Sequence, residues 1–135
     1  MKKEKQETFQ VKVTMEKKEL GYIVSGAFEG GSNYWIDSVR ARTLKGKPYR
    51  KNGYMSDVIE RGDGKLTITL IEPIDFDGER KSHGEQLDYE LTQAKLIKGI
   101  GMYLSEESHE SISNWDAGAY DCILQYALFG RGVFG

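Results

Sequence analysis

The sequence has a single cysteine, Cys122, and only two prolines and two histidines in 135 residues. One thiol cannot form an intrachain disulfide or a cysteine-based zinc site, and it is typical of a reducing cytoplasm. The histidines lie 26 positions apart without an HExxH or DxDxDG pattern, so we expect no metal and no cofactor. No apolar run is long enough for a signal peptide or a transmembrane helix, which predicts a cytoplasmic protein with no membrane partner.

The charges nearly balance, with 19 Lys and Arg residues against 21 Asp and Glu residues. A formal net charge of −2 argues against a generic binder of nucleic acid or anionic membranes, although the average can hide a local basic patch. Hydrophobic residues make up 39% of the chain, which is enough for a globular core. We expect a flexible N-terminus at 1–7 and a single globular domain at 8–135.

Hydrophobic periodicity predicts an α+β fold, in which a small, mostly antiparallel sheet packs against about three helices. The expected strands lie near 9–13, 33–39 and 65–71. The expected helices follow Thr14, run from 55 to 60, follow Thr92, and extend from about 116 to 129. The first of these helices should end at Gly30 and Gly31, because glycine adopts the left-handed conformation at little cost.

The last predicted helix is apolar on nearly every side. Only Asp116, Asp121 and Gln125 are polar within it, and Cys122 falls on an apolar stripe. A helix without a polar face is typical of a core, so we expect a buried C-terminal helix. The tail that follows carries Val133 and Phe134, which can dock on a second copy in a homodimer or fold back on their own core.

The segment EGGSNYW at 29–35 is the first candidate ligand site. It places an amide and two rings, from Asn33, Tyr34 and Trp35, where a helix meets a strand. Such a junction can hold a planar ligand, and the alternative is a helix cap followed by core aromatics.

The segment 40–54 is the second candidate, because basic residues alternate there with Tyr49 and Tyr54. Its cations are Arg40, Arg42, Lys45, Lys47, Arg50 and Lys51. Guanidinium groups bind phosphate, and rings stack on bases, whereas the alternative is a solvated loop. Strand periodicity places Tyr34 and Arg40 on one face, with Arg42 continuing it. The predicted ligand-binding set is Asn33, Tyr34, Trp35, Arg40, Arg42 and Arg50.

Two segments carry a resemblance to known proteins: EGGSNYW at 29–35 and DAGAYDCILQYALFG at 116–130. Together with LTQAKLIKGIGMYL at 91–104, they resemble a family of small uncharacterised proteins encoded by bacteriophages and prophages. The resemblance implies a phage gene product that works by binding in the cytoplasm of a bacterial host, including on host defence systems. It assigns no site residue.

Our first functional hypothesis is a non-enzymatic accessory protein that sequesters a small, anionic, nucleotide-like ligand or inhibits a host protein. The first alternative is a nucleic-acid-binding protein that uses the 40–54 basic segment. The second is a small enzyme, with carboxylates from Asp116, Asp121 and Glu29. Asp116 and Asp121 diverge by about 140° on a helix, which argues against a shared acid-base site.

Overall fold

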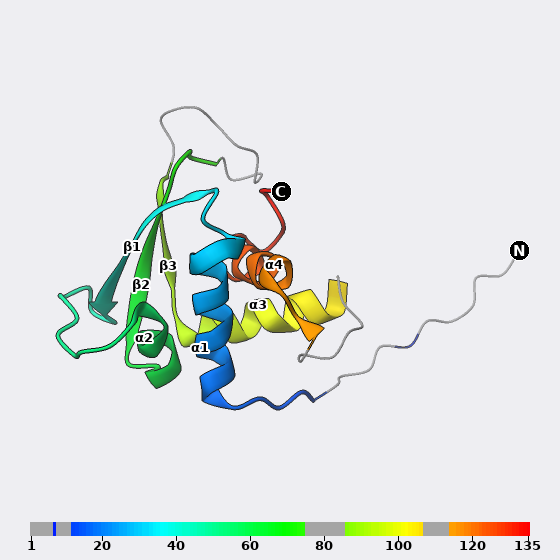
Figure 1. The fold of residues 1–135 in the computed structure, drawn as a ribbon, viewed down its shortest axis with the longest axis horizontal. Coiled ribbons are helices and arrows are strands. Elements are labelled where there is room, and N and C mark those ends of the chain that lie inside the picture. Colours follow the sequence, from blue (N-terminus) through cyan, green and yellow to red (C-terminus); the bar gives the residue numbers. More distant parts are fainter. Residues whose placement is uncertain (1–6, 8–11, 75–85, 107–113) are drawn as a thin grey trace, which may run out of the picture.

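The computed structural model describes residues 7, 12–74, 86–106 and 114–135 (Figure 1). Its helices are α1 at Lys17–Gly26, the π-helix η1 at Ala27–Gly31, α2 at Met55–Arg61, α3 at Gln93–Glu106 and α4 at Ala117–Phe129. Its strands are β1 at Ile36–Thr43, β2 at Gly64–Leu70 and β3 at Asp88–Leu91. The predicted α+β class is confirmed, and β3 is an element that the sequence pattern did not indicate.

The strands form an antiparallel sheet in the order β1-β2-β3. Val39 of β1 pairs with Ile68 of β2, which pairs with Tyr89 of β3, so these three side chains share the face that packs on the core. Helices α1, α3 and α4 lie to one side of the sheet (Figure 1). The opposite face carries polar residues from all three strands: Ser38, Arg40, Arg42, Lys65, Thr67, Thr69, Asp88 and Glu90.

Helix α4 packs on the sheet and on α3, as expected for a buried C-terminal helix. Ile123 and Leu124 are at most 1% exposed, and no residue from Ala119 to Phe129 is fully exposed. The polar residues Asp121 and Gln125 are also buried, so they need hydrogen-bond partners inside the protein. Cys122 is only half-buried, which corrects its expected position on an inward stripe.

The ends of α1 correct two details of the prediction. The helix begins after Glu16 rather than Thr14, and it continues into η1 instead of ending in a left-handed glycine. Ser32 N–H donates to the Ala27 carbonyl over 2.7 Å, closing the wide turn of a π-helix. A Cβ at Gly31 would collide with the Ala117 carbonyl, so glycine is required there for close approach to α4.

Strand β1 starts later than expected, and residues 33–35 form a turn before it. Lys12 to Glu16 have no regular secondary structure, while Phe9 and Val11 of the predicted 9–13 strand lie outside the described residues. Positions 1–6 of the expected flexible N-terminus and both histidines also lie outside them.

The C-terminal tail folds back on its own chain. Phe134 stacks on Trp35 with ring centroids 5.1 Å apart and an interplanar angle of 5°, and Val133 also packs against the core. The alternative in which the tail returns to its own core is therefore the one observed. The tail gives no reason to expect a homodimer.

We predict that Leu124→Ala lowers the free energy of unfolding by about 2–5 kcal/mol, because it leaves a cavity in a packed core. Leu44→Ala is the matched control, since Leu44 is 55% exposed, and it should change stability by no more than about 0.5 kcal/mol. Urea denaturation of both variants measures the difference. Equal stabilities would contradict the central place of α4.

Candidate anion-binding site

The aromatic residues of the 29–35 segment converge on the buried carboxylate of Asp121. Trp35 Nε1–H donates to Oδ1 over 2.7 Å, and the Tyr34 hydroxyl donates to Oδ2 over 2.8 Å. The Ser32 hydroxyl donates to Oδ1 over 2.7 Å, and Gln125 Nε2 donates to the same atom over 3.2 Å. Four donors on one acceptor-only group satisfy a carboxylate that has little access to water.

Gln125 extends this network to the C-terminal tail. Its Oε1 accepts from the backbone N–H groups of Val133 and Phe134 over 2.7 and 2.8 Å, and its Nε2 donates to the Phe134 carbonyl over 3.1 Å. We call Ser32, Tyr34, Trp35, Asp121 and Gln125 the Asp121 network. Its hydrogen bonds connect the turn after η1 to α4 and to the C-terminal tail.

The Asp121 network uses the polar groups of Tyr34 and Trp35, which were expected to bind a ligand. Trp35 is 2% exposed, and its N–H is already bonded, so the ring belongs to the core. Tyr34 is 49% exposed, but its hydroxyl is occupied by Asp121. Asn33 is exposed in the turn that follows η1 and precedes Tyr34. The alternative of a core aromatic therefore describes Trp35, whereas the Tyr34 ring remains half-exposed with its hydroxyl bonded to Asp121.

The environment of Tyr34 shifts its titration. Burial of the hydroxyl end, the hydrogen bond to Asp121 and the negative charge of Asp121 together raise the pKa of Tyr34 to about 12. The phenol therefore stays protonated, as a donor to Asp121, well above neutral pH.

The expectation that Tyr34 and Arg40 share a strand face is wrong. Tyr34 precedes β1, and the pairing register shifts between Ile36 and Ser38, so a bulge interrupts the alternation. Arg40 lies on the polar face of the sheet, where its Nη2 is 3.7 Å from Oδ2 of Asp88. Arg40 is therefore part of an exposed ion pair and is not part of the Asp121 network.

Arg42 and Arg50 lie at the other end of β1, around the loop that connects it to α2. We call residues 43–54 the basic loop. A hollow of about 500 Å³ opens there, lined by Thr43, Lys47, Pro48, Tyr49, Arg50, Lys51 and Asp63. The seven residue steps from Trp35 to Arg42 span about 23 Å of extended chain, so the aromatic residues and the basic loop do not form one site.

Hydrogen bonds hold the start of the basic loop. Thr43 N–H donates to the Lys47 carbonyl over 2.8 Å, Lys47 N–H donates to Thr43 Oγ1 over 3.0 Å, and Pro48 forms a bridge with Arg42. The Arg42 guanidinium donates to the Gly46 carbonyl over 3.4 Å. The chain therefore turns back sharply beside the edge of β1.

Asp63 anchors the far side of the basic loop. Its carboxylate accepts from the Tyr49 hydroxyl over 2.7 Å and contacts the Lys51 ammonium. The hydrogen bonds from Lys51 and then Tyr49 hold the pKa of Asp63 below its ordinary value. Asp63 lies in the turn between α2 and β2, where Gly62, with a φ of 74°, ends the helix.

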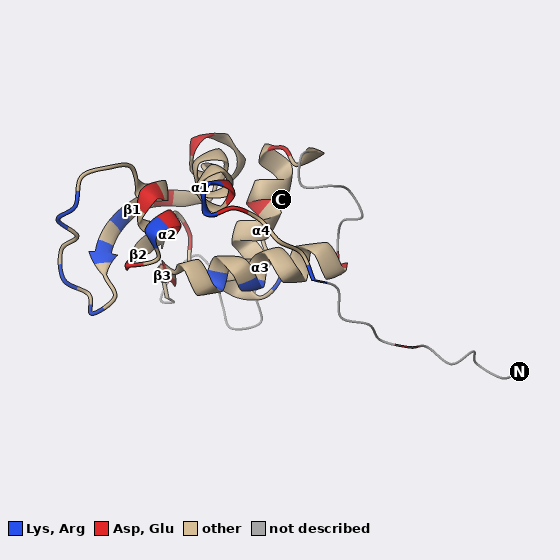
Figure 2. Cartoon of the chain, turned by 90° about the horizontal axis from the view of Figure 1, so that it is seen from below, with Lys and Arg blue, Asp and Glu red and all other residues tan. Residues whose placement is uncertain are grey.

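Three cations of the basic loop are left without carboxylates. Lys45, Lys47 and Arg50 form no ion pair within the described part of the chain. In Figure 2 the ribbon is blue, the colour of Lys and Arg, at several places along this loop and at the adjoining end of β1. Residues 40–54 contain six of the 19 basic residues and none of the 21 acidic ones, so the remaining chain has a formal charge of −8. The net charge of −2 for the whole chain does not reveal this separation of charge.

The three carboxylates of the enzyme alternative lie in different surroundings. Asp116 caps α4 by accepting from Ala119 N–H over 3.0 Å, and Asp121 is enclosed in its network. Glu29 is exposed on η1. The described residues contain no group of three His, Cys, Asp or Glu side chains arranged for a metal ion.

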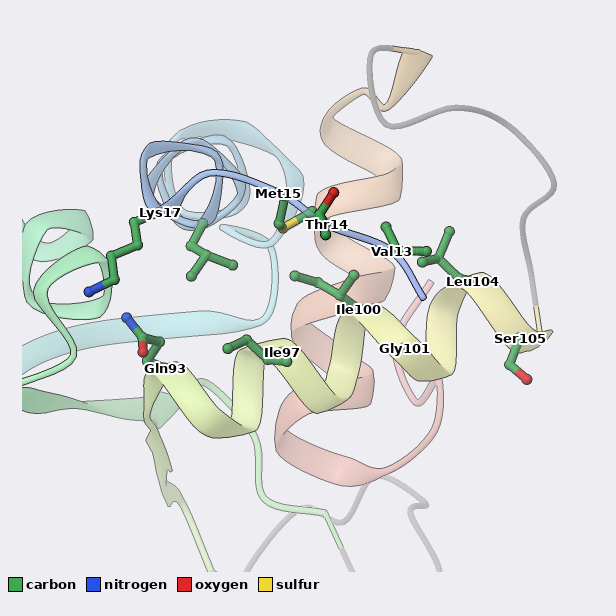
Figure 3. Close-up of a pocket in the computed structure, with 11 residues that line it drawn as sticks. Val13, Thr14, Met15, Lys17, Gln93, Ile97, Ile100, Gly101, Leu104 and Ser105 are labelled. Atoms are coloured by element: carbon green, nitrogen blue, oxygen red, sulfur yellow. The ribbon is translucent and has the colours of Figure 1, made fainter. Parts of the chain in front are cut away.

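A second hollow, of about 770 Å³, lies between residues 13–17 and α3 (Figure 3). Val13, Met15, Ile97, Ile100 and Leu104 supply apolar surface along it, and Lys17 and Gln93 lie at one end. We call it the apolar groove. It offers few polar groups to orient a small anionic ligand, in contrast to the basic loop.

Sequence reasoning singled out the cations of the basic loop but did not assign the structural roles of two carboxylates, Asp63 and Asp121, that organise the molecule. Asp63 stood next to a glycine in a turn, and Asp121 stood among apolar residues of a helix. An acidic residue on an otherwise apolar helix was the available signal for a buried hydrogen-bond centre.

Comparisons of the chain with known protein families, with curated proteins and with solved structures find no match. None of the described helices is long and apolar enough to cross a membrane.

We predict that Asp121→Asn destabilises the protein by about 2–4 kcal/mol, because the new NH₂ group would face donors instead of accepting from them. Asp116→Asn is the matched control, since asparagine caps a helix as well as aspartate does. Thermal denaturation compares the two. Similar melting temperatures would show that the network contributes little.

We predict that stability falls between about pH 10 and pH 12 and that Tyr34→Phe weakens this fall. The folded pKa of Tyr34, about 12, exceeds the unfolded value near 10, so the folded state holds the proton longer. The stabilisation is complete below about pH 10 and is lost as the pH rises through the folded pKa. Urea unfolding near pH 9 and pH 11 measures it, with Tyr22→Phe as an exposed control; equal pH dependence in both variants would refute the assignment.

Proposed function

We propose that this protein is a non-enzymatic binding protein that holds the phosphate groups of its ligand on the basic loop. The supporting observation is that Lys45, Lys47 and Arg50 have no carboxylate partner in the described structure, on a loop that hydrogen bonds hold in place. Charge-assisted bonds to phosphate oxygens are the interactions for which such groups are suited. Arg42, at the end of β1, adds a fourth cation beside them.

The proposed ligand is either a nucleotide-like anion or a nucleic acid. It does not stack on Trp35, because that ring is buried. Each phosphate bound by a cation on a nucleic acid adds to the salt dependence of affinity, whereas a single nucleotide engages few phosphates. Salt dependence therefore separates the two ligands at the same loop.

The cellular setting in this proposal is that of a small accessory protein of a phage or prophage, acting in the bacterial cytoplasm. This setting is suggested by the resemblance of the 29–35 and 116–130 segments to small uncharacterised proteins of phages and prophages. If a host protein is bound instead, the apolar groove is the surface with the suitable chemistry, because protein interfaces are centred on apolar patches. Variants of the groove are for this reason useful controls for variants of the loop.

We predict that Lys47→Ala with Arg50→Ala weakens binding of a labelled oligonucleotide of about 20 bases by about tenfold or more at low salt. The slope of log affinity against log salt should fall by about 2, one for each lost phosphate contact. Fluorescence anisotropy from about 50 to 200 mM KCl measures both quantities.

Two variants serve as controls in this experiment. Lys98→Ala removes an exposed cation of α3, and Ile97→Ser changes the apolar groove, so both should bind as the wild type does. Displacement of the oligonucleotide by excess ATP would identify a nucleotide site. Absence of oligonucleotide and ATP binding in the wild type, or equal affinity in the loop variant, would refute the proposal.

A further inference from the structure

Tyr54, at the end of the basic loop, presents its ring to solvent. Its side chain is 82% exposed, the largest value among the exposed large apolar side chains of the described residues. Leu44, at the start of the same loop, is 55% exposed, and Met55 is 39% exposed. A ring that buries so little of its surface contributes little to folding, so its place at the end of the basic loop points to a ligand.

The backbone around Tyr54 is held while its ring is left outside. Tyr54 N–H donates to Asp57 Oδ2 over 2.7 Å, and Asp57 N–H donates to the Tyr54 carbonyl over 3.0 Å. Gly53 has a φ of 138°, and a Cβ there would collide with the Asp57 carboxylate. Arg61 fixes the preceding residue by donating to the Asn52 carbonyl over 3.1 Å. Tyr54 thus carries an exposed ring on an ordered backbone, and this ring can serve as a platform.

The cations lie within reach of this platform. Tyr54 follows Arg50 by four residues, a stretch that spans at most about 14 Å even when fully extended. No acidic residue occurs in the sequence between Ser38 and Ser56, and Asp63, which lines the hollow, is already paired with Tyr49 and Lys51. One short strand of a polyanion can therefore contact the guanidinium and the ring together.

We infer that the ligand of the basic loop is single-stranded nucleic acid, with a base stacked on Tyr54 and phosphates on Lys45, Lys47 and Arg50. This inference rests on the proposed function and narrows its ligand. Stacking requires an unpaired base, because the faces of paired bases are covered in a duplex. The cations also lie on an irregular loop, rather than on the helix or two-stranded ribbon that enters a major groove.

The test compares a labelled single-stranded oligonucleotide with its duplex and with inorganic polyphosphate, which has charge and no bases. We expect the single strand to bind more tightly than either. Tyr54→Ala should weaken single-strand binding by about 5- to 100-fold, the effect of losing one stacked base, and leave polyphosphate binding unchanged. Tyr54→Phe should retain the affinity, since the ring and not the hydroxyl makes the contact.

Tyr22→Ala is the matched control, because Tyr22 is 61% exposed on α1, outside the basic loop. If duplex and polyphosphate bind as well as the single strand and Tyr54→Ala has no effect, the inference is overturned. The proposed function then survives, provided that Lys47→Ala with Arg50→Ala still weakens binding. If no polyanion binds the wild type, both fail together.

Discussion

The structure depends on one constraint, which is that the buried carboxylate of Asp121 must be satisfied by donors from the protein. Ser32, Tyr34 and Trp35 supply three of them, although they lie 86 to 89 positions away in the sequence. A buried carboxylate without hydrogen-bond partners would lower the free energy of unfolding by several kcal/mol. The fold must therefore keep these donors at Asp121. The requirement brings the turn after η1 onto α4, and the adjacent Gln125 then fastens the tail over Trp35.

This use of the aromatic segment shapes where a ligand can bind. The rings and hydroxyl that look suited to a planar ligand are already committed to the core or to Asp121. The opposite end of β1 has the reverse character, with cations that lack carboxylate partners in the described structure. One end of the strand is therefore held by a buried hydrogen-bond network, and the other carries the cations of the proposed site.

The basic loop differs from a solvated run of lysines because an acidic residue organises it. Asp63 holds Tyr49 and Lys51, while turns at Thr43 and Pro48 hold the other side. A loop that is fixed before binding loses less conformational entropy when it meets a ligand. The same carboxylate uses up Lys51, so the free charge concentrates on Lys45, Lys47 and Arg50.

The sequence by itself determined the α+β class, strand β2, helices α3 and α4 and the position of the basic cluster, because periodicity, caps and charge runs are local signals. Helix α3, for example, follows Thr92 as predicted, and Lys95 N–H donates to the Thr92 hydroxyl. Only the tertiary structure decided the rest. The bulge in β1 separated Tyr34 from Arg40, and Asp121 drew Trp35 inward, because both depend on partners far away in the sequence that no local pattern specifies.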